Sequence, residues 1–433
     1  MNVSRLMRGA SAVLVALGLM AGAVSTASAE GFAISTLSAR GGSFGGGAAS
    51  GMVARADDAS AVAYNPAGLT QLEGTQIMAG LAAVALNLDI SSHDTGHWTT
   101  NSHQVWPIPH AYISHKVNDK VAVGLGMFTR WGLGHSYPDG WASKDMEQNP
   151  HLVAGGSALK SITMLTSTIN PTLAYKINDV WSVAAGVSYT WGYLSLNNQV
   201  YIGGTPMIDT RIHSENGRSF GYNLALHAKL NEQWSAGLTY RSHERMKFNG
   251  SFRARGAHPV HGDPSFMNSR GKATIVLPDV ITLGVAYKPT DKLSFEADAA
   301  YTVWSRWRNL QVDFFNPLTQ NINQQKNWRD TWALSFSVEY WALDWLALRA
   351  GFLYETSPLN GEEYHDYYIP TNGRLQYSAG FGLKYQAWTL DFAYIYMQEK
   401  EVNLRSGGTG ETINGKFGNG YDHTFALTLG YKF

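Results

Sequence analysis

Apolar and polar positions alternate near the C-terminal end of the chain. Large apolar or aromatic side chains fill most of one set of positions, and small or polar ones fill the other: His423, Phe425, Leu427, Leu429, Tyr431 and Phe433 against Thr424, Ala426, Thr428, Gly430 and Lys432. The runs from Leu334 to Tyr340 and from Trp388 to Tyr396 repeat this alternation. A period of two over about ten residues predicts a strand with one apolar face, long enough to cross a bilayer at a tilt.

Short polar connections join these predicted strands in pairs. They lie at Asn118-Asp119, Asn178-Asp179, Asn231-Glu232, Pro289-Thr290-Asp291, Ala342-Leu343-Asp344 and Gln386-Ala387. Longer polar or glycine-rich segments alternate with them, at Ser91–Gln104, Trp131–Lys160, Asn197–Arg218, Arg253–Ser269, Asp313–Lys326, Ser357–Arg374 and Glu401–Asn419. Six short turns and seven long loops connect fourteen strands. This arrangement predicts an all-β membrane protein, a fourteen-stranded antiparallel transmembrane β-barrel of the Gram-negative outer membrane.

The N-terminal region does not follow the strand pattern. Arg5 and Arg8 precede an apolar stretch that ends at the small-residue motif Ala27-Ser28-Ala29, which predicts a secretory signal peptide over residues 1–29. Residues 30–74 are rich in Gly, Ala and Ser, and the barrel is predicted over residues 75–433. The pattern leaves two interpretations of residues 30–74: a periplasmic tail, or a plug in the barrel lumen.

Composition narrows the class of protein further. Charged residues make up 15% of the chain and aromatic residues 12%, whereas soluble domains carry about 25% charged residues. Beyond the signal peptide, no stretch approaches the ~18 apolar residues of a membrane-spanning helix. The chain has no cysteine and balanced charges, so it has no disulfide framework and gives no reason to expect a nucleic-acid partner. An aromatic-rich secreted β-sandwich is the alternative, and the strand pattern favours the barrel.

Several motifs resemble a single family. Ala56-Asp57-Asp58-Ala59, followed by Asn65-Pro66-Ala67, is similar to the N-terminal hatch of the FadL/TodX family of outer-membrane transporters of long-chain fatty acids and aromatic hydrocarbons. Motifs similar to the family's fourth, seventh, eighth and ninth strands follow in order, at Leu173–Asp179, Leu238–Ser242, Leu277–Asp279 and Ala300–Ser305. The resemblance implies a monomeric barrel plugged by residues 30–74. It also implies passive uptake of hydrophobic molecules, with an inward kink in strand three and lateral release into the membrane.

The hatch motif contains the first candidate site residues. Asn65, Pro66 and Ala67 are expected to have a structural and gating role, because Pro66 fixes its own φ and Asn65 can bond to freed backbone groups. A plain Asn-Pro turn is the alternative. Asp57 and Asp58 are expected either to pair with basic residues in the lumen or to be solvated.

Candidate substrate-binding residues come from two further regions. Lys326 lies close to where the family places a substrate-contacting lysine, and Arg329 belongs to the family-like pattern Trp328-Arg329-Asp330. No Lys or Arg occurs from Val187 to Gln199, near a binding arginine of the fatty-acid branch, so both a carboxylate substrate and a hydrocarbon stay open. A long loop carries apolar residues that fit a substrate-landing site or simply pack the loop: Trp131, Leu133, Trp141 and Met146.

Other classes of protein receive less support. A general diffusion porin would lack a plug, and a loop-mediated adhesin or receptor would not need one. The histidine spacings predict no metal site, and no catalytic constellation is evident, so neither a cofactor nor an enzyme is expected.

Gly373 stands before Arg374 where the family commonly has Asp, which predicts the loss of a lumen salt bridge. Expected partners are the hydrophobic substrate, outer-membrane lipid and lipopolysaccharide, and the barrel assembly machinery during biogenesis.

Overall fold

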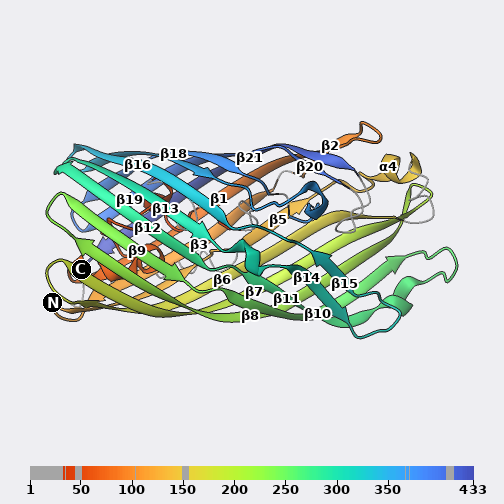
Figure 1. Ribbon diagram of the computed structural model, residues 1–433, viewed down its shortest axis with the longest axis horizontal. Coiled ribbons are helices and arrows are strands. Elements are labelled where there is room, and N and C mark those ends of the chain that lie inside the picture. The colour runs from red at the N-terminus through yellow and green to blue at the C-terminus, as the bar shows by residue number, and fades with distance from the viewer. Residues whose placement is uncertain are drawn as a thin grey trace.

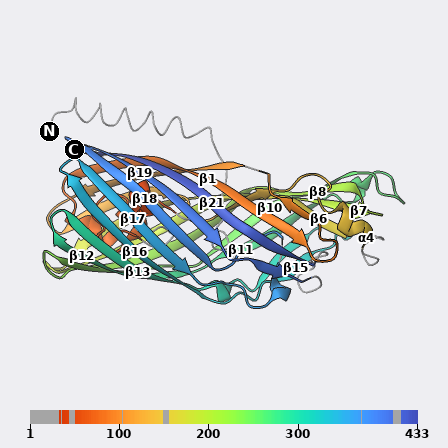
Figure 2. The same cartoon turned by 90° about the horizontal axis from the view of Figure 1, so that it is seen from above.

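The computed structural model describes residues 33–34, 36–43, 51–102, 104–148, 156–365, 367–369, 371–405 and 414–433. The predicted signal peptide lies outside these residues. The described part of the chain forms a long barrel, with the C-terminus at the left end of Figure 1 and the longer connections at the right end. Figure 2 shows the same tilted strands from above.

The barrel wall is a single antiparallel sheet. Its segments are β1 (Thr75–Ser92), β2 (Trp98–Thr100), β3 (Val105–Lys116), β4 (Val121–Phe128), β5 (Gly132–Ser136), β6 (Gly156–Lys176), β7 (Trp181–Ile202), β8 (Thr205–Lys229), β9 (Trp234–Arg241), β10 (Glu244–Gly256), β11 (Ser269–Leu277), β12 (Val280–Thr290), β13 (Leu293–Thr302), β14 (Asn309–Phe314), β15 (Ile322–Gln325), β16 (Thr331–Leu343), β17 (Leu346–Glu355), β18 (Arg374–Tyr385), β19 (Trp388–Glu399), β20 (Val402–Leu404) and β21 (Gly415–Lys432).

Short interruptions divide six wall strands in two. The divided strands are β4 with β5, β9 with β10, β11 with β12, β13 with β14, β15 with β16 and β19 with β20, and β2 belongs to a loop. The described segments therefore form fourteen wall strands, as the turn count predicts. β1 pairs with β21, from Gln76 opposite Lys432 to Ser92 opposite Gly415, and this ladder closes the barrel.

The alternation of side chains matches the two faces of the wall. On β21, Phe425 and Leu427 are each 49% exposed on the outer face, whereas Thr424 and Thr428 are fully buried toward the lumen. The outward residues meet lipid and the inward ones pack in the interior, so the period of two has a direct physical cause. The predicted assignment of faces is confirmed.

The short turns share one hydrogen-bonding device. The side-chain oxygen of Asn118 accepts from two backbone amides after it, each at 2.9 Å. Asn178 and Asn231 do the same in the next two turns, at 2.8 to 2.9 Å. An asparagine that bonds to its own following backbone fixes a tight turn. These short connections are therefore determined by their own residues.

One predicted loop is a β-hairpin instead. The sequence predicts a long loop at Asn197–Arg218, but β7 continues to Ile202 and β8 begins at Thr205. Gly203 and Gly204 form the turn, with φ of +57° and +76°. The expectation was wrong because strand pairing continues beyond the membrane, where neither face of the hairpin has to be apolar.

The helical elements are short. They are α2 (Ala39–Ser43), α3 (Ala61–Tyr64), α4 (Ser143–Gln148), η1 (Pro66–Gln71), η2 (Pro264–Met267), η3 (Trp304–Arg306) and η4 (Glu362–Tyr364). Within the described residues, none of the helices has the length and apolar character needed to cross a membrane.

Candidate functional site

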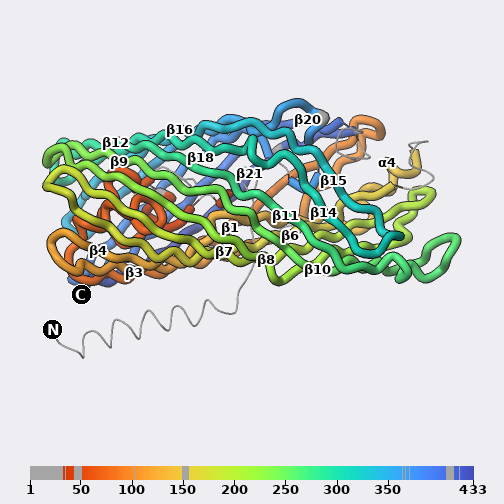
Figure 3. Tube along the Cα trace, turned by 60° about the horizontal axis from the view of Figure 1, so that its bottom comes forward, coloured from red at the N-terminus to blue at the C-terminus, as the bar shows by residue number. Residues whose placement is uncertain are grey.

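Of the described residues that precede β1, we call 33–34, 36–43 and 51–72 the lumen segment. They lie inside the barrel, close to the short turns, where their red and orange trace is enclosed by the wall (Figure 3). The amide of Gly51 donates to Asp298 Oδ2 at 2.7 Å, and that of Ala54 donates to Glu296 Oε1 at 2.8 Å. Both carboxylates belong to the inner face of β13, so the segment is bonded directly to the wall.

Glycines in the wall make room for the lumen segment. A Cβ at Gly237 would lie 2.1 Å from the carbonyl oxygen of Val53, and one at Gly284 would lie 2.9 Å from the Val53 side chain. On another wall strand, a Cβ at Gly124 would lie 2.5 Å from Val62. Glycine within a strand often marks a place where another backbone approaches closely, and here it permits that approach.

Asn65 links the lumen segment to itself and to the wall. Its Nδ2 donates to the carbonyl oxygens of Val53 at 2.7 Å and of Leu226, on β8, at 3.1 Å. Its Oδ1 accepts from the amide of Ala67 at 3.1 Å, which caps η1, and Pro66 occupies the first position of that helix. Asn65 is fully buried. It therefore bonds to freed backbone groups as expected, whereas its gating role stays a prediction.

Arg241 holds the same segment from β9. Its guanidinium donates to the carbonyl oxygens of Val62 and Ala63, at 2.9 and 2.7 Å, and to Asn170 Oδ1 at 3.0 Å. Arg241 lies within the family-like motif Leu238–Ser242, from which no role for it was predicted. A signal was available, because Arg241 shares the inward face of its strand with Thr239 and is an unusual cation on that face.

Asp57 and Asp58 take part in an ion-pair network. Arg40 lies 2.9 Å from Asp57 and 3.1 Å from Asp58, and Arg55 lies 2.9 Å from Asp57. The same two arginines also contact Glu339 on β16, at 3.2 and 2.8 Å. The two acids are therefore paired, by arginines of the lumen segment itself, and Glu339 connects the network to the wall.

Electrostatics keep Asp57 ionised. Burial by itself would raise the pKa of the Asp57 carboxyl, but Arg40 and Arg55 outweigh it and hold this pKa at about 2.

Next to the ion-pair network lies a cavity of about 750 Å³, open toward the short turns. Its lining includes Arg40, Arg55 and Glu339. The lumen segment therefore forms the inner boundary of this periplasmic cavity.

A tryptophan cluster occupies the interior on the other side of the lumen segment. Trp131 contacts Trp304 with ring centroids 5.6 Å apart, and Trp328 lies 5.0 Å from Trp304 and 4.9 Å from Trp307. All four side chains are at most 4% exposed. They come from the interruptions between β4 and β5, between β13 and β14, and between β15 and β16, so the breaks in the wall strands bring large rings into the lumen.

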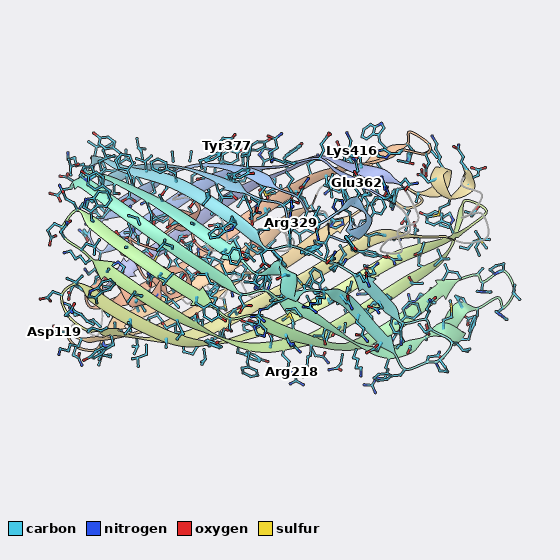
Figure 4. The ribbon with its side chains drawn as sticks, viewed as in Figure 1. Asp119, Arg218, Arg329, Glu362, Tyr377 and Lys416 are labelled. Carbon is cyan, nitrogen blue, oxygen red and sulfur yellow. The ribbon has the colours of Figure 1, made fainter. Side chains whose placement is uncertain are left out.

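Lys326 and Arg329 are not brought together. Lys326 is fully buried, and its Nζ lies 5.4 Å from the centroid of the Trp307 ring. Arg329 is exposed, and its Nε donates to the carbonyl oxygen of Ser357 at 3.0 Å (labelled in Figure 4). Of the two predicted cations, only Lys326 faces the aromatic interior.

The predicted landing-site residues are enclosed. Leu133 and Met146 are at most 2% exposed, and Trp141 is 6% exposed. Trp141 donates from Nε1 to the carbonyl oxygen of Leu159 at 2.7 Å, and its ring lies 5.6 Å from that of Tyr367. In this conformation they pack the loop region, and contact with substrate stays a prediction that requires this region to open.

A lumen salt bridge is present despite Gly373. Arg374 Nε lies 2.7 Å from Glu355 Oε2, and both side chains are 1% exposed. Glu355 belongs to β17, the neighbour of β18, where it stands directly opposite Arg374. The expected loss was wrong, because an acid across the ladder supplies the charge that the preceding residue lacks.

The third wall strand leaves the wall where β4 ends. After Phe128 the backbone turns inward, and the carbonyl oxygen of Arg130 accepts from the amide of Ile34 at 2.8 Å. Trp131 forms an isolated bridge with Ala33. The strand therefore pairs with the lumen segment at the point where it would otherwise continue along β3. We call this departure from the wall the kink, and its equivalence to the kink that the family resemblance implies stays a prediction.

The kink leaves one edge of β3 open. Among the described residues, β3 pairs with β4 only from Ala111 to Lys116, and β5 pairs only with β6. The remaining part of β3, Val105 to His110, is paired only with β1. We call this break in the backbone pairing between β3 and β5 the lateral gap.

Prolines occupy the open edge of β3. The amide of Lys116 donates to the carbonyl oxygen of Gly74, on the β1 side, and that of Val117 donates on the β4 side. Backbone groups of a strand point to alternate sides, so the nitrogens of Pro107 and Pro109 point toward the lateral gap. Proline has no amide hydrogen. The two residues therefore remove two donors that would otherwise face the gap without a partner.

No group of three or more His, Cys, Asp or Glu side chains suited to a metal ion occurs in the described part of the chain.

The model of the family "Outer membrane protein transport protein (OMPP1/FadL/TodX)" matches residues 20–433. Outer membrane protein P1 of Haemophilus influenzae is 26% identical to the chain, over 83% of it and 84% of that protein. A long-chain fatty acid transport protein of Salmonella typhi is 23% identical, over 88% and 91% of the two chains.

Solved structures show the same fold. A FadL homologue of Pseudomonas aeruginosa has a TM-score of 0.72 at 19% identity, covering 95% of this chain and 99% of that one. The toluene transporter TodX of Pseudomonas putida has a TM-score of 0.71 at 15% identity, covering 93% and 100%. With a family model that matches from residue 20 to the last residue, the chain belongs to the OMPP1/FadL/TodX family of outer-membrane transport proteins.

Proposed function

We propose that this protein takes up long-chain fatty acids or hydrocarbons by passive diffusion, with the lumen segment as its hatch and the lateral gap as its exit into the membrane. The observation that supports this most is the position of Trp131, which belongs to the tryptophan cluster, to the kink and to the bridge with the lumen segment. An interior apolar site, a gate and an exit therefore share one residue. The names of the relatives, a fatty acid transporter and a toluene transporter, agree with this class of substrate.

The physical reason for a lateral exit is the cost of exposing an apolar molecule to water. Each CH₂ group that enters water costs roughly 0.8 kcal/mol, so an acyl chain of fatty-acid length would meet a barrier of about 10 kcal/mol in an aqueous path. The lining of the periplasmic cavity includes charged residues such as Arg55 and Glu339. A path from the tryptophan cluster through the lateral gap avoids this barrier.

The hatch controls that path through its contacts with the kink. The amide of Ile34 and the bridge at Ala33 hold the kinked backbone, while Asn65 and Arg241 hold the rest of the segment against the wall. A substrate that displaces Trp131 weakens the contacts of the kink and those of the lumen segment at the same time. Movement of the hatch and widening of the gap are therefore coupled in the proposal.

Lys326 indicates which head group the substrate carries. A buried ammonium among tryptophan rings is suited to a carboxylate, which would gain a charge-assisted hydrogen bond in a low-dielectric setting. This supports a fatty acid, whereas the absence of a cation from Val187 to Gln199 leaves room for a hydrocarbon. The monomeric state and assembly by the barrel machinery stay predictions, and the proposal assigns no catalysis.

Uptake and conductance together test the proposal. Cells that lack their own transporter are given the gene and supplied with labelled oleate or toluene, and the expected result is faster accumulation of at least one of them. Purified protein in planar bilayers is expected to conduct ions poorly. Large, steady conductance would support a diffusion porin in place of a plugged transporter. Equal uptake with and without the gene would reject the transport proposal.

A further inference from the structure

Cationic side chains are exposed on the outer face of β8, β10 and β11, toward the end of the barrel with the long connections. Six of them form what we call the basic patch: Arg211, Arg218, Lys247, Arg253, Arg270 and Lys272. Arg218 projects outward from the lower edge of the barrel in Figure 4. None of the six belongs to the lumen, so the transport path does not account for them.

Two pairs within the basic patch place like charges directly opposite each other. Arg218 stands opposite Lys247 in the β8–β10 ladder, and Arg211 stands opposite Arg253. On β11, Lys272 stands opposite Asn249, one diagonal step from Lys247. Directly opposed residues have Cβ atoms about 5 Å apart, and like charges at that distance destabilise a sheet. An anion between them would reverse the sign of this interaction.

None of the six cations of the basic patch forms a salt bridge with an acidic residue of the described chain. Glu215 contacts His213 at 3.2 Å, and His213 in turn bonds to Arg211. Asp313 stands opposite Lys272 in the β11–β14 ladder, without a salt bridge between them. Arg218 and Lys247 make no ion pair with any described acid. The centre of the basic patch therefore has excess positive charge.

The basic patch begins where the lipid-facing surface ends. On β8, Phe220 is 74% exposed and Leu224 is 50% exposed on the outer face, and Arg218 is the next outward residue beyond Phe220. Trp191, opposite Arg218 on β7, is also exposed. Aromatic residues mark the interface of outer-membrane barrels. Arg218 and the opposed Lys247 therefore lie at the height of the lipid head groups, and Arg211 and Arg253 lie farther from the membrane.

From this position and charge, we infer that the basic patch binds the phosphate groups of the glycolipid of the outer leaflet, lipopolysaccharide. Its lipid anchor carries phosphates at the level of the membrane interface and acyl chains beneath them. The acyl chains would cover Phe220 and Leu224 while the phosphates lie between the opposed cations. Guanidinium and ammonium groups both form strong charge-assisted hydrogen bonds with phosphate oxygens. This inference does not depend on the proposed transport function.

Titration of the delipidated full barrel in detergent, followed by native mass spectrometry, tests the inference. The ligands are diphosphoryl lipid A, monophosphoryl lipid A and phosphatidylglycerol, with inorganic pyrophosphate as a soluble competitor. We expect the triple variant R218Q/K247Q/K272Q to bind diphosphoryl lipid A at least tenfold more weakly than the wild type, because each charged hydrogen bond is worth about tenfold in affinity. Monophosphoryl lipid A is expected to bind the wild type several-fold more weakly.

A variant of equal charge change controls for net charge. K120Q/K292Q/K384Q removes three exposed lysines at the opposite end of the barrel and is expected to bind within twofold of the wild type. Heat-modifiable mobility on gels checks that both variants are folded. Equal lipid A binding by wild type and patch variant would overturn the inference. So would phosphatidylglycerol binding as tightly as diphosphoryl lipid A, or displacement of the lipid by equimolar pyrophosphate.

Discussion

The side-chain amide of Asn65 donates to the carbonyl oxygen of Leu226 at 3.1 Å, which joins the lumen segment to wall strand β8 through a single buried side chain. The same amide donates to Val53, so one residue holds two parts of the hatch and one strand of the wall. The wall is closed by its own ladders and does not need this contact. Loss of Asn65 should therefore act on the hatch and leave the barrel intact.

We expect Asn65→Ala to raise basal ion conductance and to change oleate uptake at least twofold. The two buried carbonyl oxygens would lose their donor, at a cost of about 1–3 kcal/mol each. Asn231→Ala removes the same kind of side chain from an exposed turn and is the matched control. Heat-modifiable mobility should be unchanged in both. Normal conductance and uptake in the Asn65 variant would contradict the gating role.

We expect Lys326→Met to reduce oleate uptake about tenfold and to leave toluene uptake within twofold. Only a carboxylate would lose a charge-assisted hydrogen bond, worth roughly 1.5–3 kcal/mol. Arg329→Met removes an exposed cation three residues away and should affect neither substrate. The measurement is initial uptake of both substrates at matched expression. Equal losses for oleate and toluene would mean that Lys326 supports packing and does not recognise a head group.

We expect the double variant Pro107→Val/Pro109→Val to slow uptake several-fold while the barrel stays folded. Valine restores two amide donors toward the lateral gap, and these can recruit the returning third strand and narrow the gap. Pro289→Ala, at the end of β12, tests whether any proline loss has this effect. Uptake is measured with the better of the two substrates. An unchanged rate would show that the open edge of β3 is not the exit.

Acid should release the hatch. The pKa of Asp57, about 2 in the folded protein, lies below the ~3.9 of an unfolded aspartate. The ionised carboxylate therefore stabilises the folded state above about pH 4, and this stabilisation is lost as the pH falls from about 4 to 2. We expect ion conductance to rise over this range in the wild type.

The Asp57→Asn variant has no carboxyl to protonate at this position. Its conductance should be higher at pH 7 and should change less between pH 4 and 2. Asp119→Asn, in an exposed turn, is the control (labelled in Figure 4). The two conductance profiles must differ in this interval, and identical profiles for wild type and Asp57→Asn would exclude the ion-pair network as a hatch lock.

Periodicity and turn chemistry predicted the wall well, because both are local. Phe425 and Thr424 lie on the faces that their polarity indicates, and Asn178 forms its turn from neighbouring residues alone. The β7–β8 hairpin was missed because its pairing continues in water, where alternation of polarity is not required. Local rules therefore predict where a strand meets lipid better than where it ends.

The interior depends on contacts that no local pattern contains. Trp304 and Trp328 meet because the interruptions of two adjacent strands lie side by side, in the register that the β13–β16 ladder sets. The kink after Phe128 arises because the backbone finds a partner about 100 residues earlier in the chain, at Ile34. Glu355 forms an ion pair with Arg374 from the adjacent strand, and this partner too is distant in the sequence.

Pro107 and Pro109 have a further consequence for assembly. A strand edge that keeps both its amide and carbonyl groups can accept a strand from another molecule, which leads to strand exchange and aggregation. An edge that lacks two of its donors supports such a ladder poorly. The protein can therefore keep one seam of its wall permanently unsealed while denying that seam to a neighbouring chain.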